Sequence, residues 1–171
     1  MHLRDQILQE NSRTHTLQIV AWVGNDPARL AQLVELFLHD EYRVVQRAAW
    51  MLSYVAQKHP ELMEPHLAAM VQRMEDSGIP VAVKRNVTRI LQFLPIPPAL
   101  HGPVMHHCFE FLSNPEETIA VRAFSMTVLA NLAKEYPDIR NEIRLVLEDE
   151  LQHQPSPGFA SRAKKVLKML A

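Results

Sequence analysis

The sequence of 171 residues is poor in glycine and cysteine and contains no long apolar run. Only four glycines are present, whereas leucine, alanine, valine and arginine are abundant, and this balance favours helix over sheet. The single cysteine, Cys108, excludes an intramolecular disulfide framework and fits a reducing compartment. No stretch approaches the roughly 20 apolar residues of a membrane span, and the first residues form no apolar signal core. We therefore expect a cytoplasmic protein without a membrane partner.

The chain also lacks an excess of charge of either sign. Lysine and arginine number 18 against 19 aspartates and glutamates, which gives a formal net charge of -1. Proteins that bind nucleic-acid phosphates usually carry a clear basic excess, so this balance argues against a nucleic-acid partner. A hydrophobic content of 47% is ordinary for a packed core, and we expect one domain over residues 1–171.

Prolines and arginines recur along the chain at nearly equal intervals. The prolines are separated by 33, 38 and 39 residues and stand at Pro27, Pro60, Pro98 and Pro137. Each opens an apolar helical stretch, and an arginine follows in a second stretch, at Arg47, Arg85, Arg122 and Arg162. Two helices per repeat of this length are typical of an α-solenoid, in which one repeat cannot bury its own core. The pattern predicts an all-α fold, an α-α superhelix of about four helix pairs behind an N-terminal helical pair.

The second and third repeats match each other most closely and resemble a known family. Each has an inner proline in its first helix, Asp or Asn at the turn and an arginine in its second helix. These residues are Pro65, Asp76 and Arg85 in one repeat and Pro103, Asn114 and Arg122 in the next. The pattern resembles the HEAT repeat of armadillo-like α-solenoids, although the first and last repeats lack the inner proline. The resemblance implies a scaffold or adaptor, with each aligned arginine bonded to a turn acid of its own or a neighbouring repeat.

One stripe on the second helix of the first full repeat combines aromatic and basic residues. Arg43, Arg47, Trp50 and Tyr54 follow spacings of 4, 3 and 4, which confines them to a stripe about 60° wide, away from Leu52. Tryptophan, tyrosine and arginine are the residues most enriched at interaction hot spots. Trp22 lies in a similar stripe of the preceding helix. Two interpretations remain open: the tryptophans pack between helices, or they line an exposed groove.

A basic stripe follows one repeat later. Arg85 and Arg89 share a helix face, with Lys84 beside it. Together with Arg43 and Arg47 they predict a surface for an acidic peptide or a nucleic-acid backbone. The following helix breaks the pattern, because its polar stripe contains only one basic residue. We therefore expect no continuous basic track along the chain.

The nine histidines and the cysteine do not combine into a metal or catalytic site. His101 and His106 are five residues apart, and His106 and His107 point about 100° apart, whereas two ligands on one helix need a spacing of three or four. The adjacent His107 and Cys108 also face apart, which argues against an activated thiol. We expect no metal and no cofactor.

Three classes of function follow from these features. The first is a non-enzymatic scaffold that binds a protein or peptide on a concave helical surface. An alternative is a nucleic-acid-binding protein similar to the DNA-alkylation-repair glycosylases, whose HEAT-like repeats have a basic and aromatic concave face. Fold alone transfers no activity, and the neutral charge and short chain argue against this enzyme class. The third is a unit that self-associates through the exposed ends of the helix stack.

Overall fold

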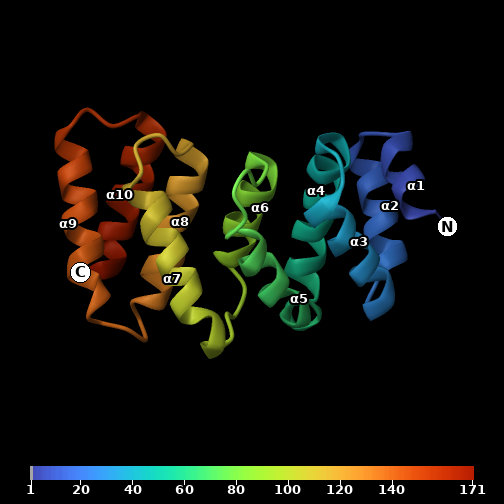
Figure 1. Cartoon of the computed structure of the whole chain (residues 1–171), viewed down its shortest axis with the longest axis horizontal. Helices are drawn as coiled ribbons and strands as arrows, with labels where there is room; N and C mark the ends of the chain where they lie inside the picture. The colour runs from blue at the N-terminus through green and yellow to red at the C-terminus, as the bar shows by residue number, and fades with distance from the viewer. Residues whose placement is uncertain (1) are drawn as a thin grey trace. The chain divides into compact units, whose positions relative to one another are not determined.

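The structure is a computed structural model that describes residues 2–171, and these residues form ten helices and no strand (Figure 1). In chain order, two to a repeat, the helices are α1 (Leu3–Gln9) and α2 (Arg13–Val23), α3 (Pro27–His39) and α4 (Tyr42–Lys58), α5 (Pro60–Arg73) and α6 (Val81–Leu91), α7 (Pro98–Ser113) and α8 (Ile119–Leu132), and α9 (Ile139–Gln152) and α10 (Pro157–Leu170). The two helices of a repeat pack on each other except in the third pair, where α5 packs mainly on α3 and α4, and α6 packs mainly on α4. The prediction of an all-α chain with four helix pairs behind an N-terminal pair is confirmed.

The periodic prolines mark helix starts for a physical reason. Pro27, Pro60 and Pro98 are the first residues of their helices, where the missing N–H has no intrahelical partner to lose. Pro137 differs from the prediction: it lies in a turn, and α9 begins two residues later, at Ile139. In that turn the carbonyl of Pro137 accepts a hydrogen bond from the following chain, so the proline initiates a turn rather than the helix.

The two inner prolines lie inside their helices without ending them. Pro65 is in the first half of α5 and Pro103 is in the first half of α7, and both are exposed. A proline removes one backbone hydrogen bond and can bend a helix. Here each helix continues beyond its proline, so these residues do not restart the helix.

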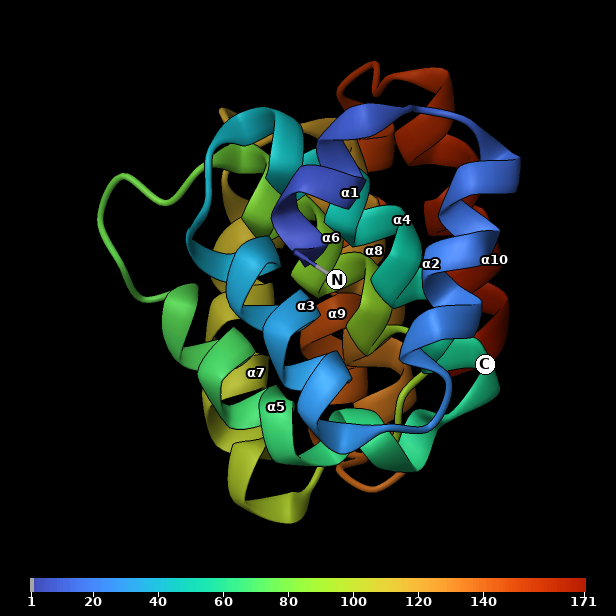
Figure 2. The same cartoon turned by 90° about the vertical axis from the view of Figure 1, so that its right-hand side faces the viewer.

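The first compact unit extends to Pro97 and is organised around α4. Helix α4 contacts the other five helices of this unit, and α1 lies against α2, α3 and α4 (Figure 2). Its buried side includes Val45, Leu52 and Val55, each no more than 1% exposed. The hydrophobic core of the unit therefore forms on one side of α4, and this leaves the opposite side of the helix for other contacts.

The second compact unit begins at Pro98 and is organised around α8 in the same way. Helix α8 contacts α7, α9 and α10, and Leu129 is fully buried at its centre. The prediction of a single domain over residues 1–171 stays a prediction.

The aligned arginines join neighbouring helices, but their acceptors differ from the expected turn acids. Arg47 donates to the carbonyls of Ile7 and Leu8, at 2.9 and 3.0 Å, near the end of α1. The last carbonyls of a helix have no intrahelical donor, and a guanidinium satisfies two of them. Arg85 reaches back to α4, where its guanidinium donates to the side-chain oxygen of Gln46 at 3.3 Å.

In the second unit the same arrangement recurs. Arg122 donates to the carbonyl of Leu112, near the end of α7, and Arg162 donates to the Thr127 hydroxyl of α8 at 2.9 Å. Asp76, the expected turn acid of the second repeat, instead binds Arg73 at 2.7 Å. The aligned arginines thus have structural roles, as the resemblance implies, although mainly through backbone carbonyls and neutral side chains.

Candidate binding surface on helix α4

Helix α4 has one side in the core and one stripe facing solvent. The hydrophobic residues of its first turns repeat at helical spacing, so the residues between them are left on the outer side. Trp50 lies on this side and is 52% exposed, and Arg43 is also exposed. Arg47 and Tyr54 are half-buried. The structure therefore favours the exposed interpretation of Trp50 over packing between helices.

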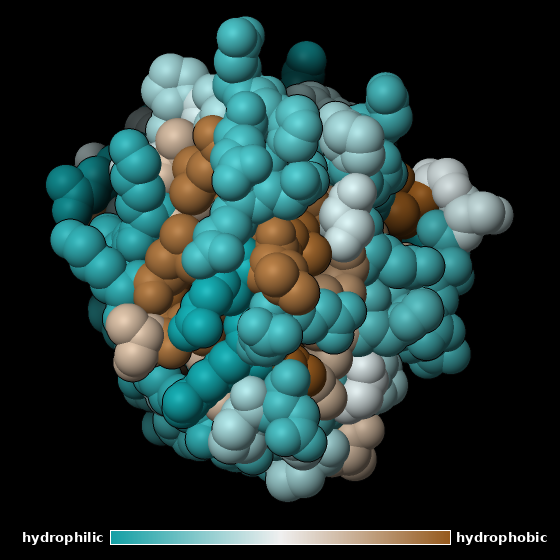
Figure 3. All heavy atoms as spheres, turned by 90° about the vertical axis from the view of Figure 1, so that its left-hand side faces the viewer, coloured by the Kyte–Doolittle hydropathy of each residue, from teal (hydrophilic) through white to brown (hydrophobic). Residues whose placement is uncertain are grey.

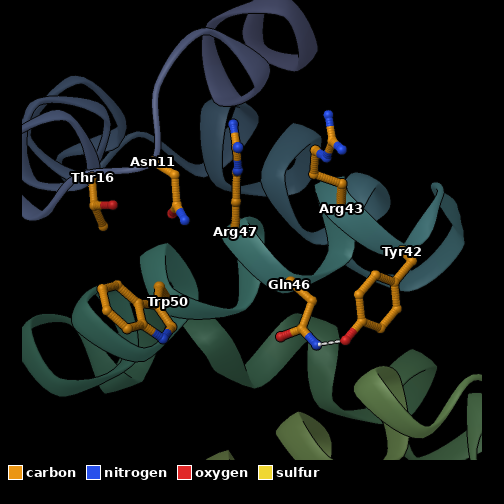
Figure 4. Close-up of a pocket in the computed structure, with 7 residues that line it drawn as sticks. All are labelled: Asn11, Thr16, Tyr42, Arg43, Gln46, Arg47 and Trp50. Carbon is orange, nitrogen blue, oxygen red and sulfur yellow. Dashed lines mark hydrogen bonds between the residues drawn. The ribbon is translucent and has the colours of Figure 1, made fainter.

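A cavity of about 460 Å³ lies along the first half of this stripe (Figure 4). Its lining residues come from α4, α2 and the segment before α2, and they are Asn11, Thr16, Tyr42, Arg43, Gln46, Arg47 and Trp50. Figure 4 shows Gln46 between Tyr42 and Trp50, with its amide bonded to the Tyr42 hydroxyl at 2.6 Å. Tyr42 is 70% exposed. Two exposed aromatic side chains thus border this cavity.

A second cavity of about 350 Å³ lies along the other half of the stripe. Its lining residues are Trp50, Ser53, Tyr54, Gln57 and Arg89, so Trp50 lines both cavities. Arg89 comes from α6, which packs beside α4 in the same unit. We call the residues that line the two cavities the α4 surface. The two cavities form one continuous surface, because Trp50 lines both of them.

The charge of the α4 surface is of one sign. Its lining residues include Arg43, Arg47 and Arg89 and no aspartate or glutamate. Arg47 is held by the α1 carbonyls. Within residues 2–171, by contrast, the guanidinium groups of Arg43 and Arg89 form no hydrogen bond or ion pair. These two groups are available to a negatively charged ligand on either side of Trp50.

Ser53 adds a polar group that the protein itself does not use. Its side-chain oxygen is buried and has no hydrogen-bond partner among the described residues, and the residue lines the second cavity. Helical serine and threonine hydroxyls commonly bond a carbonyl of the preceding turn, as Thr88 does with Lys84 at 3.0 Å. A buried hydroxyl without a partner costs free energy. A polar ligand group that reached Ser53 would recover that cost.

Two predicted site residues lie apart from the cavities. Trp22 is half-buried and lines neither of them. It packs against Arg29 instead, whose guanidinium lies 4.6 Å from its ring centre and donates a hydrogen bond to its carbonyl at 2.7 Å. Arg85 is not a lining residue either, but its contact with Gln46 places it at the edge of the α4 surface. The structure thus brings five of the predicted residues together, namely Arg43, Arg47, Trp50, Tyr54 and Arg89.

Sequence reasoning missed six residues of the surface, and four of them were within its reach. On α4 these are Tyr42 and Gln46, eight and four residues before Trp50, and Ser53 and Gln57, three and seven residues after it, all on the same side of the helix. Widening the stripe around Trp50 would have included them. Asn11 and Thr16 belong to another part of the chain, and no spacing within α4 points to them.

Among residues 2–171, no group of three His, Cys, Asp or Glu side chains is placed to hold a metal ion. His101 bonds the Tyr136 hydroxyl at 2.8 Å. Burial raises the pKa of the Cys108 thiol to about 12, so this thiol is neutral near pH 7 and is not an activated nucleophile.

Comparison with known proteins identifies the family. None of the helices in the described part of the chain is long and apolar enough to span a membrane. No curated protein and no solved structure gives a significant match to the chain. A family model described as a HEAT repeat domain matches residues 3–170. With its paired helices and nearly its whole length covered, the chain belongs to the HEAT repeat family.

Proposed function

We propose that this HEAT repeat protein is a non-enzymatic scaffold that binds a segment of another protein on the α4 surface. The observation that carries the proposal is the position of Trp50, which is 52% exposed and lines both cavities. An exposed tryptophan contributes less to folding than a buried one, because much of its apolar surface remains in water. On a binding surface the same exposed ring supplies a large contact area with few rotatable bonds.

The charges of the surface indicate an acidic partner segment. Arg43 and Arg89 carry the available guanidinium groups, and no carboxylate lines either cavity. An arginine binds a carboxylate through two parallel hydrogen bonds and is itself enriched at hot spots. We therefore propose a segment that places an apolar side chain on Trp50 and acidic side chains toward Arg43 and Arg89.

A nucleic-acid partner is the second candidate, and the aromatic and arginine content of the surface favours it. Aromatic side chains stack on bases, and guanidinium groups bind phosphates. Two features favour the acidic peptide instead. Arg47 and Arg85 already donate hydrogen bonds within the first unit, and the net charge of the chain is -1. A phosphate-binding surface relies on several cationic groups that are free to bind.

The proposal is tested on an array of random peptides probed with the labelled protein. We expect the bound peptides to be enriched in aspartate and glutamate. The double variant Arg43→Glu with Arg89→Glu should lose this preference, because it reverses the charge on both sides of Trp50. Arg140→Glu, which changes an exposed arginine of α9, is the matched control and should bind like the wild type.

The outcomes separate the two candidates. If the bound peptides are not enriched in aspartate and glutamate, the proposed preference for acidic segments is wrong, but the proposed peptide-binding function still holds. Binding to duplex DNA that weakens steeply with salt, and that is lost in the double variant, would favour the nucleic-acid candidate. No peptide binding at all would contradict the proposed function.

A further inference from the structure

Helix α9 presents an exposed strip in which acidic side chains surround an apolar one. The strip consists of Glu142, Leu145, Glu148 and Asp149, which fall within about 120° of the helix circumference. Leu145 is 59% exposed, the most exposed leucine among the large exposed hydrophobic residues. Arg144 lies outside the strip, where its guanidinium bonds the carbonyl of Leu170 at 3.3 Å. The strip is therefore apolar at its centre and negative at its edges.

The neighbouring helix α10 presents a strip of the opposite charge. Lys164, Lys165 and Lys168 are all exposed and lie within about 100° of the helix circumference. No aspartate or glutamate occurs between the first and last residues of α10. None of the three lysines forms a hydrogen bond or ion pair in the described part of the chain. The lysine strip is thus free to bind a negatively charged surface.

Both strips point away from the core of the second unit. On α9 the buried residues are Ile143 and Leu147, and on α10 they are Phe159, Ala163, Val166 and Leu170. Every one of these residues lies more than a quarter turn from the strip on its own helix. Because α9 and α10 pack against each other, the acidic and lysine strips together form the outer face of this helix pair. Figure 3 views this end of the chain and shows apolar side chains set among polar ones.

We infer that this outer face binds a second copy of the chain, with α9 of each copy against α10 of the other. A twofold interface brings the same surface of both copies together. If α9 of one copy packed on α9 of the other, the two acidic strips would repel each other. If α10 packed on α10, the two lysine strips would repel each other. The crossed arrangement places each acidic strip against a lysine strip. It also buries the Leu145 side chain of both copies in the interface. Complementary charges of this kind determine the orientation of an interface.

The inference is independent of the α4 surface, which belongs to the other compact unit. It is tested by the mass of the protein in solution, measured by sedimentation equilibrium over a wide range of concentration. We expect the mass to rise from that of one chain to that of two and to rise no further. Added salt should weaken the association, because exposed charges are screened.

Charge reversal tests the crossed arrangement. The variant Glu142→Lys with Glu148→Lys gives both strips a net positive charge, and the variant Lys164→Glu with Lys168→Glu gives both strips a net negative charge. Each variant alone should associate at least about tenfold more weakly than the wild type, since like charges then face each other across the interface. An equimolar mixture of the two variants should recover the association. Lys58→Glu with Lys134→Glu, which reverses two exposed lysines elsewhere, is the matched control and should dimerise normally.

Several results would overturn the inference. The inference is wrong if the mass of the wild-type protein equals that of one chain at every concentration. It is also wrong if the protein forms assemblies of more than two chains. Variants that dimerise alone as tightly as the wild type would show that these strips are not the interface. Circular dichroism of each variant checks that a loss of association is not a loss of folding.

Discussion

At the scale of single residues, Arg122 joins three helices of the second unit. Its buried guanidinium donates to the Leu112 carbonyl and to Glu150, and it lies 4.7 Å from the ring centre of Phe159. Arg122→Ala should lower the free energy of unfolding by about 2–3 kcal/mol, because it leaves a carbonyl and a carboxylate without their donor. Urea denaturation measures the change. Arg140→Ala is the exposed control, and an equal loss in both variants would contradict the structural role of Arg122.

Cys108 gives a pH dependence with a definite sign. Burial raises the pKa of its thiol from 9.0 to about 12 in the folded chain. As the pH rises above 9, the unfolded thiol ionises while the folded one stays neutral, so the contribution of this group to stability is lost by up to about 1.4 kcal/mol per pH unit. The difference in unfolding free energy between the wild type and Cys108→Ala should therefore shift against the wild type in this range. A difference that does not change with pH would contradict the buried, neutral thiol.

At the scale of one helix, one side of α4 packs in the hydrophobic core and the opposite side forms the α4 surface. Leu52 is fully buried, whereas Trp50, two residues earlier, is half exposed. Leu52→Ala should cost about 2–5 kcal/mol of unfolding free energy, the range for removing a buried leucine side chain. Chemical denaturation gives this value directly. A cost below 1 kcal/mol, on the scale of an exposed substitution, would mean that α4 is not the centre of its unit.

Helix periodicity explains which parts of the site the sequence predicts. Residues of one helix share a face when they are three or four positions apart, and Arg47, Trp50 and Tyr54 satisfy this rule. The partners of the arginines were harder to predict, because a backbone carbonyl carries no signature in the sequence. Arg47 is bound by carbonyls about 40 residues away, and Asn11 joins the cavity from before α2. Such contacts depend on how helices pack, which the period alone does not specify.

At the scale of the whole molecule, the HEAT pattern extends through two compact units. Repeat proteins gain stability from the interfaces between neighbouring repeats, so short arrays tend to unfold together. We expect one cooperative transition in urea. Both tryptophans, Trp22 and Trp50, belong to the first unit, so fluorescence reports on that unit while circular dichroism reports on all helices. Coincident transitions would agree with one cooperative body, and a separate later or earlier loss of helicity would contradict it.

The central claim is that Trp50 serves binding more than folding. The measurement that tests it most directly is the affinity of Trp50→Ala for the acidic peptides that the wild-type protein selects. We expect the affinity to fall by roughly thirtyfold or more, which corresponds to about 2 kcal/mol for a central aromatic anchor. The melting temperature should stay nearly unchanged, because the ring is 52% exposed. A variant that binds these peptides as tightly as the wild type, or that loses binding only because it unfolds, would contradict the claim.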